Sequence, residues 1–193
     1  MKQKTKSKNI PDLLTLTPSQ ALWPRHLGGR LGNGTPCQLW AIGNPDILNE
    51  RKVGLFCSVR YPAEANLEAQ DAARRLRDEG STVISGFHSP VEKECLRILL
   101  QGNQPIIFCL ARSLFKIRIP SEWRKALDAG RLFILSPFEK RPRRPDARSA
   151  RRRNELVAAL ADEVLIIHAT PGGQIERIAE LVDHWHIPRR KLI

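Results

Sequence analysis

The chain has 193 residues, the size of one domain with short extensions. Hydrophobic residues make up 41% and charged residues 27%, which supplies a hydrophobic core and excludes a chain that is disordered throughout. No apolar run reaches the roughly 18 residues of a membrane span. The Lys-rich first ten residues lack the apolar stretch of a secretory signal. We therefore expect a cytoplasmic protein with no membrane partner.

The net charge of +12 is concentrated in three segments. Residues 1–10 carry four lysines, residues 189–191 read Arg-Arg-Lys, and residues 139–153 carry eight basic side chains against two acids. An internal Arg-rich segment beside a fold is typical of phosphate or nucleic-acid binding, because a planar guanidinium can hold two phosphate oxygens. The alternative is a solvated loop without a partner.

The first 36 residues differ in pattern from the rest. We predict a basic tail and a short N-terminal helical extension over residues 1–36, and one domain over residues 37–193. Thr17-Pro18-Ser19-Gln20 predicts the start of a short helix that ends near Pro24. The Gly-rich residues 28–34 predict a loop, residues 39–42 a short strand, and residues 45–49 a turn or short helix.

From residue 53 onward, apolar strands alternate with amphipathic helices. Strands are predicted over residues 53–57, 82–84, 105–110, 132–135 and 164–167, and helices over 62–79, 90–101, 121–129, 147–161 and 174–185. Continuously apolar strands favour a parallel sheet that is covered on both faces, and the alternation implies right-handed crossovers. The predicted fold class is therefore α/β: a Rossmann-like, three-layer αβα fold with a mainly parallel sheet.

Small, polar or basic residues follow each of the five strands, at the edge where open parallel sheets bind ligands. Ser and Gly let the backbone approach a phosphate, and helix N-termini present free N–H groups. Each exit alone is explained by turn and cap preferences, but together they predict one anion pocket, with Arg60 and Arg112 as clamps. The candidate residues at these exits are Ser58, Arg60, Ser85, Gly86, His88, Ser89, Arg112, Ser136, Gly172 and Gly173.

Motifs of common enzymes are missing from the sequence. It contains no GxGxxG after the first strand, no GxxxxGK[ST] and no GxSxG. His88, Ser89 and Glu92 lie close together, but Ser89 and Glu92 are explained as a helix capping box. The four cysteines form no CxxC pair. We therefore predict a binding protein rather than an enzyme, with no catalytic residue, no metal and no cofactor.

Three motifs occur in a recognisable order. Residues 53–60 read Val-Gly-Leu-Phe-Cys-Ser-Val-Arg, residues 85–92 contain Ser-Gly-x-x-x-Pro-Val-Glu, and Arg153-Asn154 precedes the apolar strand at 164–167. Over residues 39–185 this order resembles the DprA/Smf family of DNA-processing proteins, whose motifs are Gly-Ser-Arg, Ser-Gly-x-x-x-Gly-Ile-Asp and Arg-Asn-Arg. The Arg-Asn pair with its following strand is the most specific piece.

The resemblance implies a Rossmann-like domain that binds single-stranded DNA, forms a homodimer and loads a RecA-type recombinase. By position, Ser58 and Arg60 would hold a phosphate, and Ser85 and Gly86 would line the pocket. Arg153 and Asn154 would support or contact the strand.

The chain departs from the family pattern at several positions. Cys57 replaces a glycine, the arginine falls one residue late at Arg60, and Glu155 replaces the last arginine of Arg-Asn-Arg. We expect no C-terminal winged-helix domain. Residues 170–173 (Thr-Pro-Gly-Gly) are similar to a motif of the related lonely-guy phosphoribohydrolases, but the Gly-Thr and the acid of that motif are not in place.

These observations lead to one main hypothesis and two alternatives. The main hypothesis is a DprA/Smf-like protein that binds single-stranded DNA in DNA processing, uptake or recombination, with Phe87 and Phe138 either stacking on bases or lying in the core. The first alternative is a small-nucleotide sensor or nucleotide N-glycosidase that uses the same pocket. The second is an interaction module whose Arg-rich segment meets an acidic protein.

Overall fold

The computed structural model describes residues 12–140 and 144–192. The predicted basic tail at residues 1–10 lies outside this range, as do Arg141 and Arg143 of the Arg-rich segment. The strands are β1 (Leu14–Leu16), β2 (Leu39–Gly43), β3 (Lys52–Cys57), β4 (Thr82–Ser85), β5 (Ile106–Cys109), β6 (Leu132–Ser136), β7 (Glu163–His168) and β8 (Arg189–Lys191). The helices are α1 (Leu27–Leu31), α2 (Ala65–Asp78), α3 (Pro90–Leu99), α4 (Ser121–Asp128), α5 (Ala147–Leu160) and α6 (Gln174–His184), with 3-10 turns η1 (Gly32–Gly34) and η2 (Pro45–Asn49).

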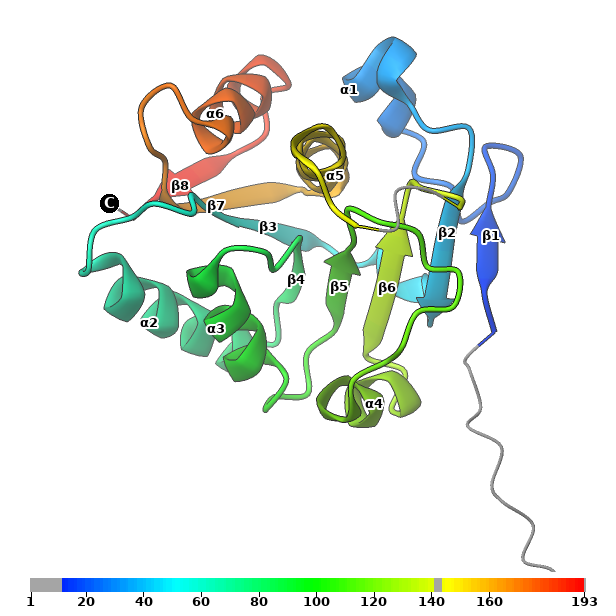
Figure 1. Cartoon of the computed structure of the whole chain (residues 1–193), viewed down its shortest axis with the longest axis horizontal. Coiled ribbons are helices and arrows are strands. Elements are labelled where there is room, and N and C mark those ends of the chain that lie inside the picture. The colour runs from blue at the N-terminus through cyan, green and yellow to red at the C-terminus, as the bar shows by residue number, and fades with distance from the viewer. Residues whose placement is uncertain (1–11, 141–143, 193) are drawn as a thin grey trace, which may run out of the picture.

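All eight strands form one sheet in the order β1-β2-β6-β5-β4-β3-β7-β8. Strands β3 to β8 are parallel, whereas β2 runs antiparallel to β6 and β1 antiparallel to β2. Helices α1, α5 and α6 cover one face, and α2, α3 and α4 cover the other (Figure 1). The predicted Rossmann-like three-layer fold with a mainly parallel sheet is therefore confirmed.

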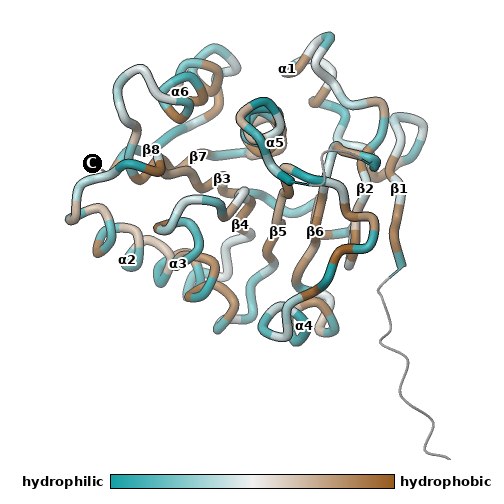
Figure 2. The backbone as a smooth tube through the Cα atoms, viewed as in Figure 1, coloured by the Kyte–Doolittle hydropathy of each residue, from teal (hydrophilic) through white to brown (hydrophobic). Residues whose placement is uncertain are grey.

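The central strands are hydrophobic on both faces, as the sequence predicts. Figure 2 shows the brown colour of hydrophobic residues along β3, β5 and β6. Their side chains alternate between two core clusters: Leu55 and Ile134 pack toward α2, α3 and α4, whereas Phe56 and Phe133 pack toward α1, α5 and α6. Burial on both faces explains why these strands show apolar runs rather than alternation.

Predictions fail mainly at the two ends of the chain. The predicted helix between Thr17 and Pro24 is wrong, because the segment forms turns. Gln20 Oε1 does accept from the Thr17 amide (2.9 Å), but so short a segment before a proline gives a helix too few residues to nucleate. A helix begins instead at Leu27, one residue before the predicted loop, and residues 189–191 form β8, a strand that the sequence did not predict.

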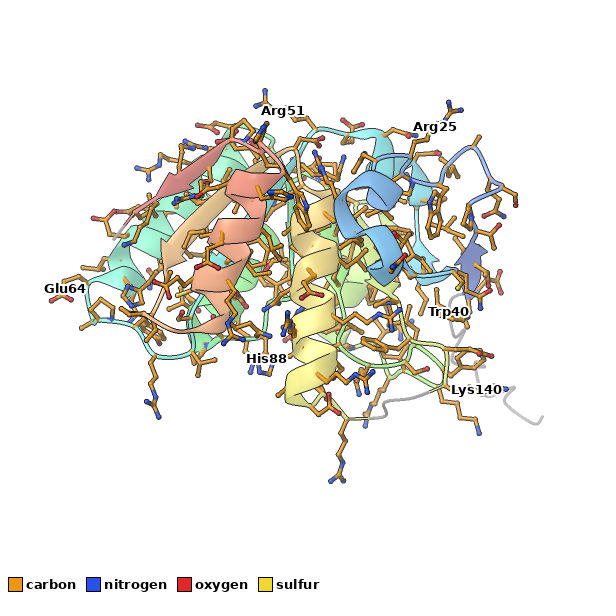
Figure 3. The ribbon with its side chains drawn as sticks, turned by 90° about the horizontal axis from the view of Figure 1, so that it is seen from above. Arg25, Trp40, Arg51, Glu64, His88 and Lys140 are labelled. Atoms are coloured by element: carbon orange, nitrogen blue, oxygen red, sulfur yellow. The ribbon has the colours of Figure 1, made fainter. Side chains whose placement is uncertain are left out.

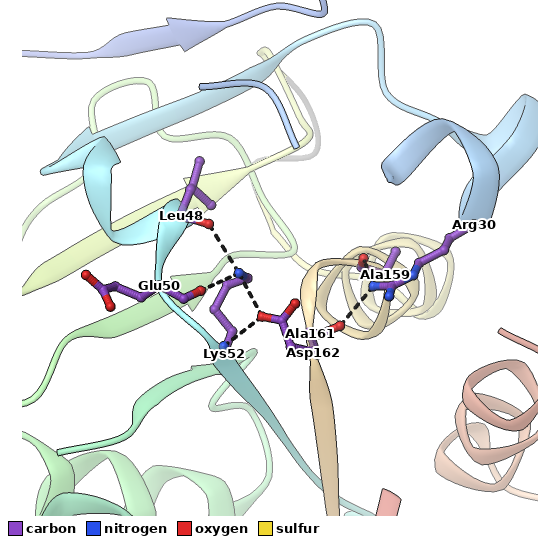
Figure 4. A network of polar contacts seen from close by, with 7 residues as sticks. All are labelled: Arg30, Leu48, Glu50, Lys52, Ala159, Ala161 and Asp162. Carbon is purple, nitrogen blue, oxygen red and sulfur yellow. Dashed lines mark hydrogen bonds and ion pairs between the residues drawn. The ribbon is translucent and has the colours of Figure 1, made fainter. Parts of the chain in front are cut away.

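The N-terminal extension packs on the same sheet as the rest of the chain. Trp23 and Leu27 are buried in the core beside α5. Arg30 donates to the carbonyls of Ala159 (2.7 Å) and Ala161 (2.9 Å), which caps the C-terminal end of α5 (Figure 4). The predicted division after residue 36 stays a prediction. No helix in the described residues is both long and apolar enough to cross a membrane.

A buried ammonium group ties the start of β3 to the start of β7. The Lys52 side chain is only 5% exposed, and its Nζ pairs with Asp162 Oδ2 (2.9 Å) and donates to the carbonyls of Leu48 (3.2 Å) and Glu50 (2.6 Å) (Figure 4). Asp162 Oδ2 also accepts from the Lys52 amide (2.8 Å). Burial raises the pKa of Asp162, but the amide and ammonium groups of Lys52 lower it by more. This network fixes the end of the sheet that lies opposite the candidate site.

We predict that Asp162→Asn lowers the free energy of unfolding by about 1–3 kcal/mol at pH 7, because a buried ammonium loses its counter-ion. Since the pKa of Asp162 is lower in the folded state, this stabilisation is present at neutral pH and is lost as the pH falls below about 4. Urea unfolding at pH 7 and pH 3 measures both values. Asp71→Asn, in an exposed pair with Arg74, is the control and should cost less than about 1 kcal/mol. An equal loss at both pH values for Asp162→Asn would contradict the prediction.

Candidate functional site

Two adjoining cavities lie at the carboxyl ends of the parallel strands. The smaller, which we call the strand-end cavity, has a volume of about 290 Å³ and lies between the exits of β3 and β7. The larger, the α3–α4 groove, has a volume of about 830 Å³. Predicted residues that line the strand-end cavity are Ser58, Arg60, His88, Ser89, Arg153, Asn154 and Gly173. Those that line the α3–α4 groove are Gly86, His88, Arg112 and Arg153.

The prediction of one pocket clamped by Arg60 and Arg112 is wrong in its geometry. Arg60 lines the strand-end cavity and Arg112 lines the α3–α4 groove, so the two residues belong to different cavities. His88 and Arg153 line both cavities and form the boundary between them. Among the described residues, neither Arg60 nor Arg112 forms an ion pair. Both charges are therefore available to a ligand.

The two serines predicted to line the pocket at the exits of β4 and β6 do not reach it. Ser85 and Ser136 are fully buried. Ser85 Oγ donates to Leu55 O (2.8 Å) and accepts from the Phe87 amide (3.1 Å). Ser136 Oγ likewise donates to Arg112 O (2.7 Å) and accepts from the amide two residues later (3.1 Å). These hydroxyls stabilise turns, as Ser does at many loop starts.

Arg153 is a buried cation at the centre of the site. Its side chain is almost wholly enclosed, with the whole residue 4% exposed. Nη1 donates to Gly86 O (3.0 Å) and Nε to Asn154 Oδ1 (2.7 Å), while Asn154 Nδ2 donates to Gln174 Oε1 (3.1 Å). These contacts join the β4 exit to α5 and α6. Burial lowers the pKa of Arg153, and the nearby Glu92 partly offsets that effect.

Gly86 is required by the approach of Arg153. A Cβ at Gly86 would lie 2.1 Å from Arg153 Nη1, so no other residue fits without displacing the guanidinium. Within the described range no carboxylate pairs with that guanidinium. The buried Glu92 carboxylate acts on this charge from beyond ion-pair distance and offsets only part of the cost of its burial. The arrangement therefore favours an anion at the boundary of the two cavities.

Glu92 closes the N-terminus of α3 to external anions. Its side chain accepts from the amides of Cys57 (3.0 Å), His88 (2.7 Å) and Ser89 (3.1 Å). The predicted capping box is confirmed, because Ser89 Oγ also accepts from the Glu92 amide (3.2 Å). The prediction of open N–H groups at this exit is wrong, since the protein's own carboxylate takes them.

The N-terminus of α6 remains open. Its N-cap residue, Gly173, has no side chain to cap the helix, and Gly173, Gln174 and Ile175 line the strand-end cavity. Gly172 lines neither cavity, and its amide donates to Glu176 Oε2 (2.6 Å) at the exposed surface. An 11-residue helix that begins at the cavity wall favours negative charge there.

Two residues that were not among the candidate site residues hold the strand-end cavity together. Thr170 donates its amide to Ser58 Oγ (3.0 Å) and its hydroxyl to Arg60 O (2.9 Å), which joins the exits of β3 and β7. Gln174 supports Asn154, as described above. Thr170 begins the Thr-Pro-Gly-Gly segment, but nothing in the sequence marks either contact, because each joins segments far apart in the chain.

His88 is an exposed side chain at the mouth of both cavities, at the end of the molecule opposite Arg51 (Figure 3). Burial lowers the pKa of His88, Arg153 and Lys93 lower it further, and Glu92 partly opposes them. The ring is therefore neutral at pH 7, and it can donate or accept a hydrogen bond to a ligand.

Of the two aromatic residues considered for base stacking, only Phe138 is accessible. Phe87 is 2% exposed and packs edge-on against Phe108, with ring centroids 5.3 Å apart, so it belongs to the core. Phe138 is half-buried, and the Arg152 guanidinium lies 5.9 Å from its ring centroid. A base could meet an aromatic and a cationic group together at this point.

Comparison with known proteins identifies the family. The family model for DNA recombination-mediator protein A matches residues 14–176. The chain belongs to this family. The resemblance in the motifs is thereby confirmed, and a role in DNA processing follows from it, whereas the nucleotide sensor or N-glycosidase is not favoured. No curated protein sequence matches the chain significantly.

Several solved structures share the fold. DNA processing protein A from Helicobacter pylori is 23% identical with a TM-score of 0.74, covering 95% of this chain and 82% of its own. DprA from Streptococcus pneumoniae is 19% identical with a TM-score of 0.70, covering 88% of this chain and 60% of its own. The molybdenum cofactor binding protein from Rippkaea orientalis is 11% identical with a TM-score of 0.52, covering 74% and 76%.

We predict that Glu92→Gln destabilises the fold by about 1–3 kcal/mol, because an amide group cannot accept from all three N–H groups that the carboxylate satisfies. Glu94→Gln on the same helix is the matched control. Glu94 forms a surface pair with Arg97, and its loss should cost less than about 1 kcal/mol. Chemical unfolding of both variants measures the difference, and equal losses would show that the buried carboxylate is not an organising group.

Proposed function

We propose that this protein binds single-stranded DNA along the carboxyl edge of its sheet and acts in DNA processing, uptake or recombination. Membership of the DNA recombination-mediator protein A family supports the proposal. So does the H. pylori relative, whose structure is described as showing a single-stranded DNA binding mode. The observation that carries the proposal is the buried Arg153, which has no carboxylate partner in the described structure and lies between two open cavities.

The charges at this edge define a path for a phosphate backbone. Arg60 and the open N-terminus of α6 would hold one phosphate in the strand-end cavity, and Arg153 with His88 would hold the next at the boundary. Arg112 continues the path into the α3–α4 groove. The exposed Arg152, beside Phe138, extends it along α5. A row of arginines in place of a closed pocket suits a polymer more than a single nucleotide.

Other parts of the proposal rest on the family resemblance. We propose a homodimer, a cytoplasmic location and delivery of the DNA to a RecA-type recombinase. The sequence features that would make a nucleotide N-glycosidase are replaced, since Ile175 and Glu176 occupy the positions of the Gly-Thr pair in the lonely-guy motif. We therefore propose a binding protein without a catalytic residue.

We predict that Arg60→Ala weakens binding to a single-stranded oligonucleotide roughly 5- to 10-fold at low salt. It should also reduce the slope of log affinity against log salt by about 0.7, the contribution of one neutralised phosphate in a single strand. Fluorescence anisotropy at several salt concentrations gives both quantities, and the same titration with a duplex tests strand preference.

Arg51→Ala is the matched control, because it removes the same charge at the opposite end of the sheet, where Arg51 pairs with Glu163 (3.3 Å; Figure 3). This variant should bind as the wild type does. An Arg60→Ala variant with unchanged affinity and slope would remove the strand-end cavity from the DNA site.

A further inference from the structure

The α3–α4 groove has an aromatic floor that the phosphate path does not use. Phe108 lies at its base, 6% exposed, and makes an edge-on contact with Trp123, with ring centroids 4.8 Å apart. Trp123 comes from α4 and is only half-buried, so part of its indole ring remains accessible in the groove. Leu96 of α3 and Leu100, the residue that follows this helix, also line the groove. The floor is therefore apolar, with one large ring partly open to a ligand.

The rim of the groove carries positive charge. Lys93, Arg97, Arg112 and Arg153 line it, against Glu94 and Glu122. Glu94 is already held by Arg97 (2.6 Å). Lys93 and Arg112 form no ion pair with any residue in the described ranges. A ligand that suits both floor and rim is flat and apolar on its faces and carries negative charge beside them.

The groove adjoins the strand-end cavity, because His88 and Arg153 line both. A strand whose phosphates lie on Arg60, Arg153 and Arg112 would therefore run from the strand-end cavity to the groove. The volume of about 830 Å³ falls within the range of small-ligand sites and exceeds what a single side chain would fill.

We propose that the α3–α4 groove receives one unstacked nucleobase of the bound strand, with Trp123 as the stacking surface. This inference rests on the proposed function, since the phosphates beside that base are those held at the strand ends. An apolar peptide segment would satisfy the floor but would leave the cationic rim without a counter-charge. A nucleobase joined to its phosphates matches both, and base stacking on an aromatic ring tolerates any sequence.

The test compares two strands and three tryptophan variants, one of them a control. The strands are an oligothymidylate and an abasic strand of the same length, which keeps the phosphates and lacks the bases. Trp123→Ala should weaken binding of the oligothymidylate roughly 5- to 100-fold, the usual worth of one stacked base, and leave the abasic strand within twofold. Trp123→Phe should retain most of the affinity. Trp185→Ala, a half-buried tryptophan on the opposite face of the sheet, is the control and should bind both strands normally.

A second measurement does not depend on the alanine variant folding. Oligothymidylate should quench the tryptophan fluorescence of the wild type more than that of Trp123→Phe, and the abasic strand should give no such difference. Unchanged quenching in Trp123→Phe, or equal loss of both strands in a folded Trp123→Ala, would overturn the inference while the proposed function stands. If the wild type binds neither strand, the proposed function itself fails, and the inference fails with it.

Discussion

The candidate site depends on one buried cation. Arg153 projects from α5 into the place where the β4 exit, α3 and α6 meet, and it is held there by a carbonyl of Gly86 and an amide oxygen of Asn154. Its hydrogen bonds go to neutral acceptors, and the buried Glu92 carboxylate offsets only part of the cost of burying its charge. Two cavities open on either side of it, and an incoming anion is the partner that would complete its charge balance.

Elsewhere along this edge, the protein's own side chains accept from some backbone N–H groups and leave others open. Glu92 takes three backbone N–H groups around the start of α3, and the serines after β4 and β6 take those of the turns that follow. These internal bonds make the loops rigid. What remains accessible is the start of α6 and the guanidinium groups of Arg60 and Arg112. A fixed frame with a few exposed cations is well suited to holding a flexible polyanion at low entropic cost to the protein.

The sequence predicted the sheet and its helices well because each central strand is buried on both faces and most helices have clear caps or stops. The sequence-based prediction failed at the N-terminus. There the capping pattern at Thr17–Gln20 forms a turn in place of a helix, and β1 and α1 show no hydrophobic periodicity. For the site, the rule that ligands bind at strand ends placed Arg60 and Arg112 at the correct edge. The same rule could not distinguish a serine that faces a ligand from Ser85, whose hydroxyl turns inward, because both uses favour the same residue. Nothing in the sequence marked Trp123 as a site residue, since its accessibility depends on how α4 packs beside α3.

The central claim is that a strand of DNA lies on the carboxyl edge of the sheet. Hydrogen–deuterium exchange with and without a single-stranded oligonucleotide tests it most directly. We predict slower exchange in the segments after β3, β4, β5 and β7 and in the first turn of α6, with no change at the opposite edge around Lys52 and Asp162. Protection confined to that opposite edge, or to the Arg-rich segment before α5 with the strand exits unchanged, would contradict it.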